Sequence, residues 1–460
     1  MTKTTFAGLA FAAVFVLLGL IAGYWVLDRS SDRGDVTSLR PAPAVEAHPS
    51  FLYGRVVTVA GQTYEGRLRW GSDQEAFWDD HFNGVRVENR WAAYLPPEQL
   101  STQGRSIKVF GIKIGSWERQ TDLRRLFMVR FGDITRIEAV GVTRVRVTLK
   151  SGTVIDLNRS DASDFDDGVR VWDSKRGVVD INSLWIRSIE LLQPERSSAA
   201  LDRLYGTVQT QHGEFTGFVQ WNRAKGIGSD ELSGRAGDDH IRIRFDTIRS
   251  IAGESRTSSR ITLRDGREIV LSGTSDTGRH NQGIYVDDPR YGRVLISWDV
   301  FERVDFNEEG AGLAGSGPVY SDFPPGYPLT GTVTTRQGRR LAGRLVYDLD
   351  ESETTDTLDA PLQGVDYFIP FGLITSLRLS SPENHDGDSA SLILVSGEEL
   401  SLERRGDLSD ANRGMLVFVE EQHAEFVPWD DIERIDFERP PPVGEPKANS
   451  RKPEGVGWRR

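Results

Sequence analysis

Histidines that stand next to carboxylates are the first residues of this chain to test for chemistry. His81 follows two aspartates, His240 follows another two, and His423 follows two glutamates and a glutamine. A catalytic metal centre needs two or three histidines that converge. These three occupy different places in the chain and show no metal-ligand spacing, so we interpret each as part of a solvated loop.

A cluster of aspartates has the composition of a cation site. Asp161, Asp164, Asp166 and Asp167 precede Gly168, but the spacing of a calcium-binding EF-hand loop is absent. We therefore predict an acidic turn rather than a calcium site.

Other catalytic patterns are missing from the sequence. It contains neither the G-x-S-x-G motif nor a Ser/His/Asp pattern, and the glycines at 111–116 and 311–316 lack the context of a nucleotide-binding loop. We expect no enzymatic activity, no cofactor and no metal. Carboxylates brought together from distant parts of the chain leave a hydrolase as a remote alternative.

Tryptophans are the remaining candidates for a functional surface. Trp78, Trp91 and Trp117 lie within or beside one segment that has no counterpart elsewhere in the chain. Such a segment often carries the function of a repeated scaffold, so these rings are predicted to contact a partner protein or to stack on sugars. A structural lid is the alternative. Trp298 and Trp429 share an equivalent position and are predicted to fill a core.

Self-comparison of the chain finds three large repeats, at 51–192, 203–306 and 326–437. Each repeat is doubled internally, which predicts six small modules. A turn glycine precedes the closing apolar motif of every module at a similar distance; these glycines are Gly61, Gly152, Gly213, Gly266, Gly338 and Gly397. Only the first module has a longer interval, which indicates an insertion at 85–126.

Each module is predicted to consist of short strands joined by tight turns. Apolar and charged residues alternate at 241–245, as in a half-buried strand. Asp265-Gly266 lies between two such runs and is a hairpin signal. The closing motif has an apolar residue at every third position, which predicts one tight helical turn before the last strand. Within the insertion we expect a strand near 107–114 and a short helix near 117–127.

This layout resembles the SH3-type and Sm-like small β-barrels, one module at a time. The resemblance implies an all-β chain in which each repeat is a pair of small SH3-like barrels. It does not imply RNA binding, because the usual RNA-contact residues of the Sm family are missing. The alternative is a six-bladed β-propeller with one four-stranded blade per module. Unequal spacers, including a Gly/Pro-rich linker at 307–325, favour barrels.

The N-terminus predicts a membrane anchor. Residues 6–27 form an uncharged apolar run of 22 residues, long enough for a helix across a bilayer. A cleaved signal peptide is the alternative, but the run is longer than usual and no clear cleavage site follows it. We assign 1–28 to the anchor and 29–50 to a polar stalk. The N-terminus would be cytoplasmic and the body extracytoplasmic, as in a bacterial periplasm. The tail at 438–460 is predicted to be disordered.

Composition narrows the function further. The formal net charge of −12 argues against a nucleic-acid partner. The chain has no cysteine, which excludes disulfides and cysteine-ligated metals. The favoured hypothesis is a membrane-anchored extracytoplasmic scaffold that binds other envelope proteins. A cell-wall or carbohydrate-binding module is the first alternative, and a hydrolase is the second.

Overall fold

The computed structural model describes residues 48–71, 74–97, 108–109, 112–113, 125–194, 202–307, 318–380 and 389–439. The chain divides into two compact units, Met1–Pro41 and Ala42–Arg460, and every described residue belongs to the second. The predicted anchor at 1–28, most of the stalk, most of the tail and Trp117 lie outside these residues. No helix within the described ranges is both long enough and apolar enough to cross a bilayer.

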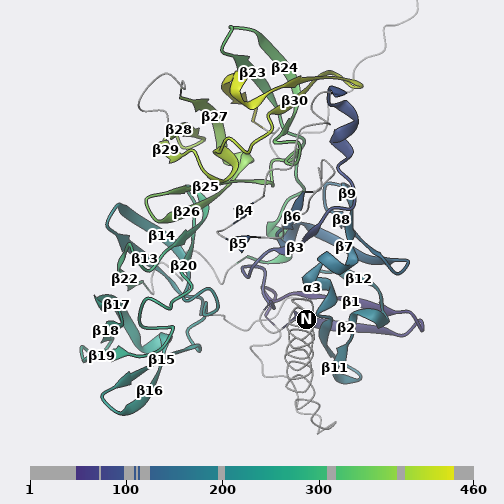
Figure 1. Cartoon of the computed structure of the whole chain (residues 1–460). Coiled ribbons are helices and arrows are strands. Elements are labelled where there is room, and N and C mark those ends of the chain that lie inside the picture. Colours follow the sequence, from purple (N-terminus) through teal and green to yellow (C-terminus); the bar gives the residue numbers. More distant parts are fainter. Residues whose placement is uncertain are drawn as a thin grey trace, which may run out of the picture. The chain divides into compact units, whose positions relative to one another are not determined.

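The described residues are mostly β-strand, which confirms the all-β prediction (Figure 1). Only α3 (Ser163–Asp166) is an α-helix with its bounds in the described part of the chain. Strands of the described residues form three large sheets, of eight, twelve and eight strands, and two small two-stranded sheets. This division does not match six separate four-stranded propeller blades.

Repeat 1 forms the first large sheet. Its strands are β1 (Tyr53–Thr58), β2 (Thr63–Trp70), β7 (Ile134–Val140), β8 (Arg144–Leu149), β9 (Val154–Asn158), β10 (Val169–Asp173), β11 (Gly177–Ile181) and β12 (Ile186–Leu191). They lie in the order β11-β10-β2-β1-β12-β7-β8-β9. A separate pair in the same repeat consists of β3 (Phe82–Val85) and β6 (Leu126–Val129).

Repeat 2 supplies ten strands to the second large sheet. They are β13 (Tyr205–Thr210), β14 (Gly213–Gln220), β15 (Glu231–Ala236), β16 (Asp239–Arg244), β17 (Ile248–Ser255), β18 (Ser258–Leu263), β19 (Glu268–Ser272), β20 (Ile284–Asp288), β21 (Gly292–Ile296) and β22 (Phe301–Phe306). Their order is β16-β15-β19-β18-β17-β22-β13-β14-β20-β21.

Repeat 3 forms the third large sheet and completes the second. Its strands are β23 (Thr330–Thr335), β24 (Arg340–Tyr347), β25 (Thr357–Leu362), β26 (Val365–Pro370), β27 (Ile374–Leu379), β28 (Ser389–Leu394), β29 (Glu399–Glu403), β30 (Met415–Glu420), β31 (His423–Val427) and β32 (Ile432–Phe437). Eight of them lie in the order β29-β28-β27-β32-β23-β24-β30-β31, while β26 and β25 continue the second sheet beyond β21.

Equivalent strands follow the same order in all three large sheets. In this order, a hairpin of each module pairs with strands of the other module of the same repeat. In repeat 2 the first hairpin, β13–β14, pairs with β22 and β20 of the second module. The hairpin β18–β19 of the second module pairs in turn with β17 and β15 of the first. A module therefore cannot leave its repeat without breaking strand pairs. Closure of the sheets into paired barrels stays a prediction.

The predicted turn chemistry is confirmed. All six turn glycines have positive φ, between +79° at Gly61 and +152° at Gly213, a backbone conformation that other residues rarely adopt. The predicted helical turn before the last strand is a 3-10 turn in five modules: η3 (Phe131–Asp133), η5 (Ser183–Trp185), η6 (Phe245–Thr247), η8 (Phe371–Leu373) and η10 (Trp429–Asp431). Further 3-10 turns are η4 (Arg159–Asp161) and η9 (Gly406–Leu408).

Each repeat has a core built around the same pair of aromatic rings, one from the end of its second strand or directly after it and one from a 3-10 turn. The pairs are Trp70–Phe131, Trp221–Phe245 and Tyr347–Phe371, with ring centroids 5.0, 6.5 and 5.1 Å apart. Trp429 is only 3% exposed, as predicted for a core residue. Trp298 departs from this prediction in part, because it is half-buried and packs against the edge of the core.

The insertion predicted at 85–126 coincides with the turn of one hairpin. Val85 at the end of β3 pairs with Leu126 at the start of β6. The predicted single strand near 107–114 is instead two paired strands, β4 (Lys108–Val109) and β5 (Ile112–Lys113). The segment also contains the 3-10 turn η2 (Arg90–Tyr94). The helix predicted near 117–127 falls mostly outside the described residues, and its last two residues belong to β6.

The described end of the predicted linker packs onto repeat 1. It contains η7 (Tyr320–Asp322), and the ring of Tyr320 stacks on that of Phe77 with centroids 5.7 Å apart. Lys150 of repeat 1 donates a hydrogen bond to the carbonyl oxygen of Phe323 at 2.9 Å. This part of the linker is therefore bound to the fold, where the sequence had predicted a spacer.

Candidate interaction surfaces

One of the aspartates considered for a cation site holds a strand in place. Asp164 accepts a hydrogen bond from the backbone N–H of Asn83 at 2.8 Å. Two equivalent bonds occur in the other repeats, Ser233 N–H to Asp276 at 2.8 Å and Asp359 N–H to Asp407 at 2.7 Å. Each bond links a turn of one module to the third strand of the other. No group of three or more potential metal ligands occurs in the described part of the chain.

The three histidines do not come together. Burial, followed by the charges of Arg293 and Arg130, lowers the pKa of His81 to about 3, so its imidazole is neutral. His240 and His423 are exposed, but they lie in the strands β16 and β31 rather than in loops. These three histidines therefore do not form a pair for metal or acid–base chemistry.

Trp78 is buried between repeats 1 and 2. Only 4% of its surface is exposed, and the guanidinium of Arg203 lies 4.3 Å from the centre of its ring. The same loop continues the contact, because Asp80 accepts hydrogen bonds from Arg223 at 2.8 Å and from Tyr285 at 3.0 Å. Trp78 therefore fastens repeat 1 to repeat 2.

Trp91 is buried between the insertion of repeat 1 and the outer face of repeat 3. It is 5% exposed, and its ring meets that of Phe418 edge-on with centroids 5.8 Å apart. Two ion pairs stand at the base of the insertion: Arg86–Asp350 at 2.7 Å and Arg125–Asp348 at 2.8 Å. Trp78 and Trp91 thus occupy internal junctions, and neither ring forms part of an exposed surface.

A cavity of about 360 Å³ lies beside Trp91. Arg90, Tyr94, Arg344 and Glu353 help to line it. The guanidinium of Arg90 lies 4.4 Å from the centre of the Trp91 ring. Cations, a carboxylate and aromatic rings around one hollow are suited to a small polar ligand.

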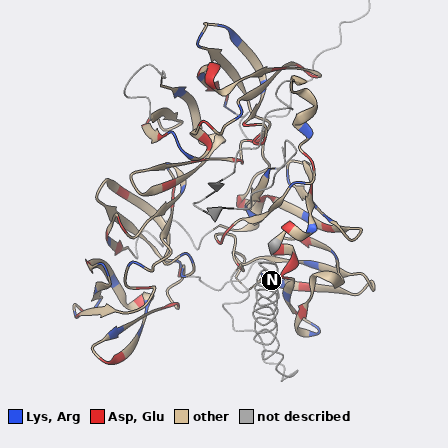
Figure 2. Cartoon of the chain, in the orientation of Figure 1, with Lys and Arg blue, Asp and Glu red and all other residues tan. Residues whose placement is uncertain are grey.

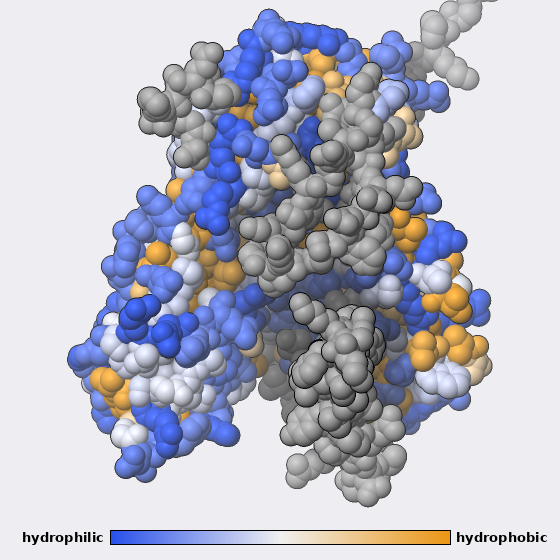
Figure 3. Space-filling view, viewed as in Figure 1, coloured by the Kyte–Doolittle hydropathy of each residue, from blue (hydrophilic) through white to orange (hydrophobic). Residues whose placement is uncertain are grey.

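Large exposed apolar residues gather at one end of repeat 1. Leu184 is 71% exposed, Trp185 61% and Val59 56%. The backbone N–H of Val59 donates to the carbonyl oxygen of Trp185 at 2.9 Å, so the turn of the β1–β2 hairpin lies beside η5. Figure 3 shows hydrophobic residues at the surface over the end of this hairpin. We call residues 59–62 and 183–185 the repeat-1 tip.

The repeat-1 tip was missed at the level of sequence, although a signal was present. Trp298 and Trp429 stand at the first position of the closing turn, where repeat 1 has Ser183. Ser183 is 2% exposed, so it occupies the interior position. The tryptophan of this turn stands two residues later, at Trp185, and is exposed.

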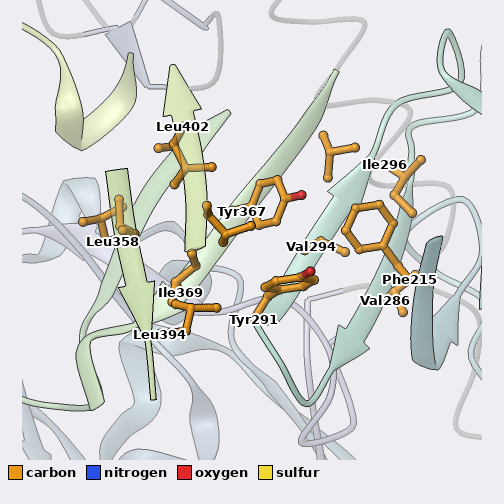
Figure 4. Close-up of a cluster of buried hydrophobic side chains, with 14 of the residues drawn as sticks. Phe215, Val286, Tyr291, Val294, Ile296, Leu358, Tyr367, Ile369, Leu394 and Leu402 are labelled. Atoms are coloured by element: carbon orange, nitrogen blue, oxygen red, sulfur yellow. The ribbon is translucent and has the colours of Figure 1, made fainter. Parts of the chain in front are cut away.

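Repeats 2 and 3 are joined by strand pairing. β21 pairs antiparallel with β26, from Arg293 opposite Phe368 to Ile296 opposite Val365. Figure 4 shows the side chains that pack around this joint. The strand of repeat 1 equivalent to β21 is β11, which pairs with β10 on one side and with none of the described strands on the other.

Charged side chains of both signs are mixed on the described strands. Figure 2 shows acidic and basic residues interspersed along the strands. Many of them pair across neighbouring strands, for example Arg146 with Asp156 and Arg170 with Asp180, both at 2.7 Å. Ion pairs this exposed contribute little to stability, but they neutralise the sheet surface.

Comparisons of the chain with models of protein families, with curated proteins and with solved structures found no match.

Proposed function

We propose that the protein is a membrane-anchored extracytoplasmic scaffold that binds other envelope proteins. In this proposal residues 6–27 cross the bilayer with the N-terminus in the cytoplasm. The body stands in an extracytoplasmic compartment such as a bacterial periplasm. Each repeat forms a pair of SH3-like barrels that share strands through their exchanged hairpins.

The pairing of β21 with β26 is the observation that carries this proposal. With it the chain already joins two of its own repeats by adding a strand to a sheet edge. Strand addition is also a general way of binding a partner, because main-chain hydrogen bonds supply affinity and alternate side chains supply specificity. The equivalent edge of repeat 1, at β11, is the docking site that we propose.

The composition of β11 suits an added strand. Val178 is 53% exposed, and the one charged residue of the strand, Asp180, pairs with Arg170 at 2.7 Å. Exposed edges that must stay free usually carry charges. The edge strand β16 of repeat 2 follows that rule, with Arg242 and Arg244 among its residues. β11 carries fewer charges, because Asp180 is its one charged residue.

Site-specific photo-crosslinking tests the proposal. A photoreactive amino acid at Val178 in the full chain, expressed in its native membrane, should give a discrete adduct with a second protein. The control is the same probe at Val142, which is 86% exposed in a turn of the same repeat. No adduct at Val178, or the same adducts from both positions, would refute strand addition at β11.

The carbohydrate-binding alternative has the cavity beside Trp91 in its favour. Aromatic and charged residues around a hollow of about 360 Å³ can hold a sugar ring. Calorimetric titration of the full chain with soluble cell-wall fragments tests it. Fragments that no longer bind Tyr94→Ala, but still bind a β11 variant that has lost the crosslink at Val178, would favour this alternative over the scaffold.

A further inference from the structure

The repeat-1 tip can be compared with two internal counterparts. A backbone hydrogen bond shared by the three repeats defines the equivalent positions: it joins Val59 to Trp185, Gln211 to Val300, and Arg336 to Asp431. The position of Leu184 is occupied in the other repeats by Asp299 and Asp430. The fold accepts an aspartate at the position of Leu184 in both other repeats and at that of Trp185 in repeat 3, so the apolar set of repeat 1 is not needed to build the turn.

Cations flank the tip, and carboxylates are absent from it. Lys175 and Arg176 are exposed in the neighbouring β10–β11 turn. The guanidinium of Arg176 lies 4.6 Å from the centre of the Tyr64 ring, and the Tyr64 hydroxyl donates to Gln62 of the tip at 2.9 Å. No Asp or Glu occurs at 59–63, 174–176 or 182–185, although the chain contains 68 acidic residues.

Two carboxylates beside the tip are already engaged, and the first is Asp166, which accepts a hydrogen bond from the Ser183 hydroxyl at 3.2 Å. Asp173 accepts hydrogen bonds from the backbone N–H groups of Glu65, Lys175 and Arg176 at 2.9, 2.8 and 2.9 Å. It therefore shapes the turn that presents the two cations. By contrast, the corresponding turn of repeat 3 contains Glu420 and Glu421.

We propose that the repeat-1 tip docks onto an anionic lipid surface. Tryptophan is favoured at the boundary between lipid and water, where its ring meets the acyl region and its N–H meets water. Leu184 and Val59 add apolar area to the same end, and Lys175 and Arg176 complement lipid phosphates. A lipid surface fits better than a protein groove because the apolar residues project from two turns at the end of a sheet.

This inference rests on the proposed anchor, because a bilayer spanned by residues 6–27 would supply the lipid surface. Residues 28–47 separate the apolar run from the first described residue, His48. Twenty extended residues cover at most ~70 Å.

Single-cysteine labelling tests the proposal, because the chain has no cysteine of its own. Ala60→Cys places a thiol in the tip, and His212→Cys places a matched thiol in the equivalent turn of repeat 2. Each full-length variant is labelled with a polarity-sensitive fluorophore and reconstituted in phosphatidylcholine vesicles with or without phosphatidylglycerol. Quenching by a lipid-bound nitroxide then reports contact with the bilayer.

The label at position 60 should be quenched in phosphatidylglycerol vesicles, and the label at 212 should not. Leu184→Asp with Trp185→Asp introduces the residues that repeat 3 has at these positions, so the fold should persist and the quenching should be lost. Lys175→Gln and Arg176→Gln should each weaken the contact about fivefold in anionic vesicles. Equal quenching at 60 and 212, or quenching that survives the double aspartate change, would overturn the proposal.

The same vesicles separate failure of the tip from failure of the anchor. If the chain still floats with the vesicles after an alkaline wash but the label at position 60 is not quenched, the result supports the anchor and overturns the docking. Flotation that is lost in the wash, with quenching at position 60 beforehand, would support the docking and refute the anchor. A chain that never floats with vesicles would overturn both.

Discussion

Replacing Trp429 by alanine should remove much of the stability of repeat 3. The indole is 3% exposed and meets the ring of Tyr347 edge-on at 5.6 Å. A buried tryptophan removes about 150–250 Å² from water, which is worth ~4–6 kcal/mol at 25 cal/mol per Å². Truncation of buried tryptophans typically costs ~3–5 kcal/mol, so we expect about 4 kcal/mol for Trp429→Ala.

Trp298 is the matched control, because it occupies the equivalent position in repeat 2. It is half-buried, with its ring 5.1 Å from that of Phe301 and 6.0 Å from that of Trp221. Because more of its surface stays exposed to water than that of Trp429, Trp298→Ala should cost less than Trp429→Ala. The two substitutions are chemically identical, so the difference measures burial.

Differential scanning calorimetry of the full chain in detergent measures both effects. Repeats 2 and 3 share a sheet, and a cooperative unit of that size loses roughly 2–4 °C in Tm for each kcal/mol. Trp429→Ala should therefore lower Tm by about 10 °C, and Trp298→Ala should lower it by less. Equal shifts, or no shift for Trp429→Ala, would refute the reasoning from burial. If Trp298→Ala left Tm unchanged and abolished ligand binding, the Trp298 ring would be a ligand-binding surface rather than part of the core.

Three further outcomes follow from the structure. Burial raises the pKa of Asp79 from 3.8 to about 7; the folded state then holds more protons than the unfolded state, so stability falls as pH rises through this window. Asp79→Asn should make the free energy of unfolding, measured by urea titration, depend less on pH between 3.8 and about 7. Gly217→Ala should unfold repeat 2, because a Cβ there would lie 2.0 Å from a backbone carbonyl oxygen. Gly266→Ala is the control: its Cβ meets nothing within 4 Å, so it should cost only ~1–2 kcal/mol of backbone strain. Replacing residues 88–124 by a Gly/Ser loop should keep the β-type circular dichroism but expose Phe418. Binding of a hydrophobic dye and a lower Tm of repeat 3 would report this exposure. An unchanged Tm would contradict the contact between Trp91 and Phe418.

Local rules account for what the sequence predicted correctly. Alternation gives strands, the six glycines give tight turns, and the period-3 ending gives a 3-10 turn, because each depends on residues close together in the chain. The bounds of the insertion were predictable for the same reason. Hairpin exchange was not. The hairpins β13–β14 and β18–β19 have similar patterns, so local sequence does not say which module each will complete.

The two junction tryptophans were beyond local rules as well. Trp78 and Trp91 carry no signal that separates a ring buried between repeats from a ring exposed on one repeat. Their partners, Arg203 and Phe418, stand far away in the chain and belong to other repeats. Trp185 is different, because comparison of equivalent positions shows that its turn departs from the pattern.

The exchange of positions between serine and tryptophan in this turn is unfavourable for the folding of repeat 1. Ser183 places a hydroxyl where its equivalents place an indole, and its Oγ must reach Asp166 at 3.2 Å for a partner. Trp185 leaves most of a large apolar ring in water, which favours neither folding nor solubility. Repeat 3 builds the same turn with Trp429 inside and Asp431 outside. Neither change helps repeat 1 to fold, and an exposed indole at this end of the repeat is what the proposed docking to a lipid–water boundary would use.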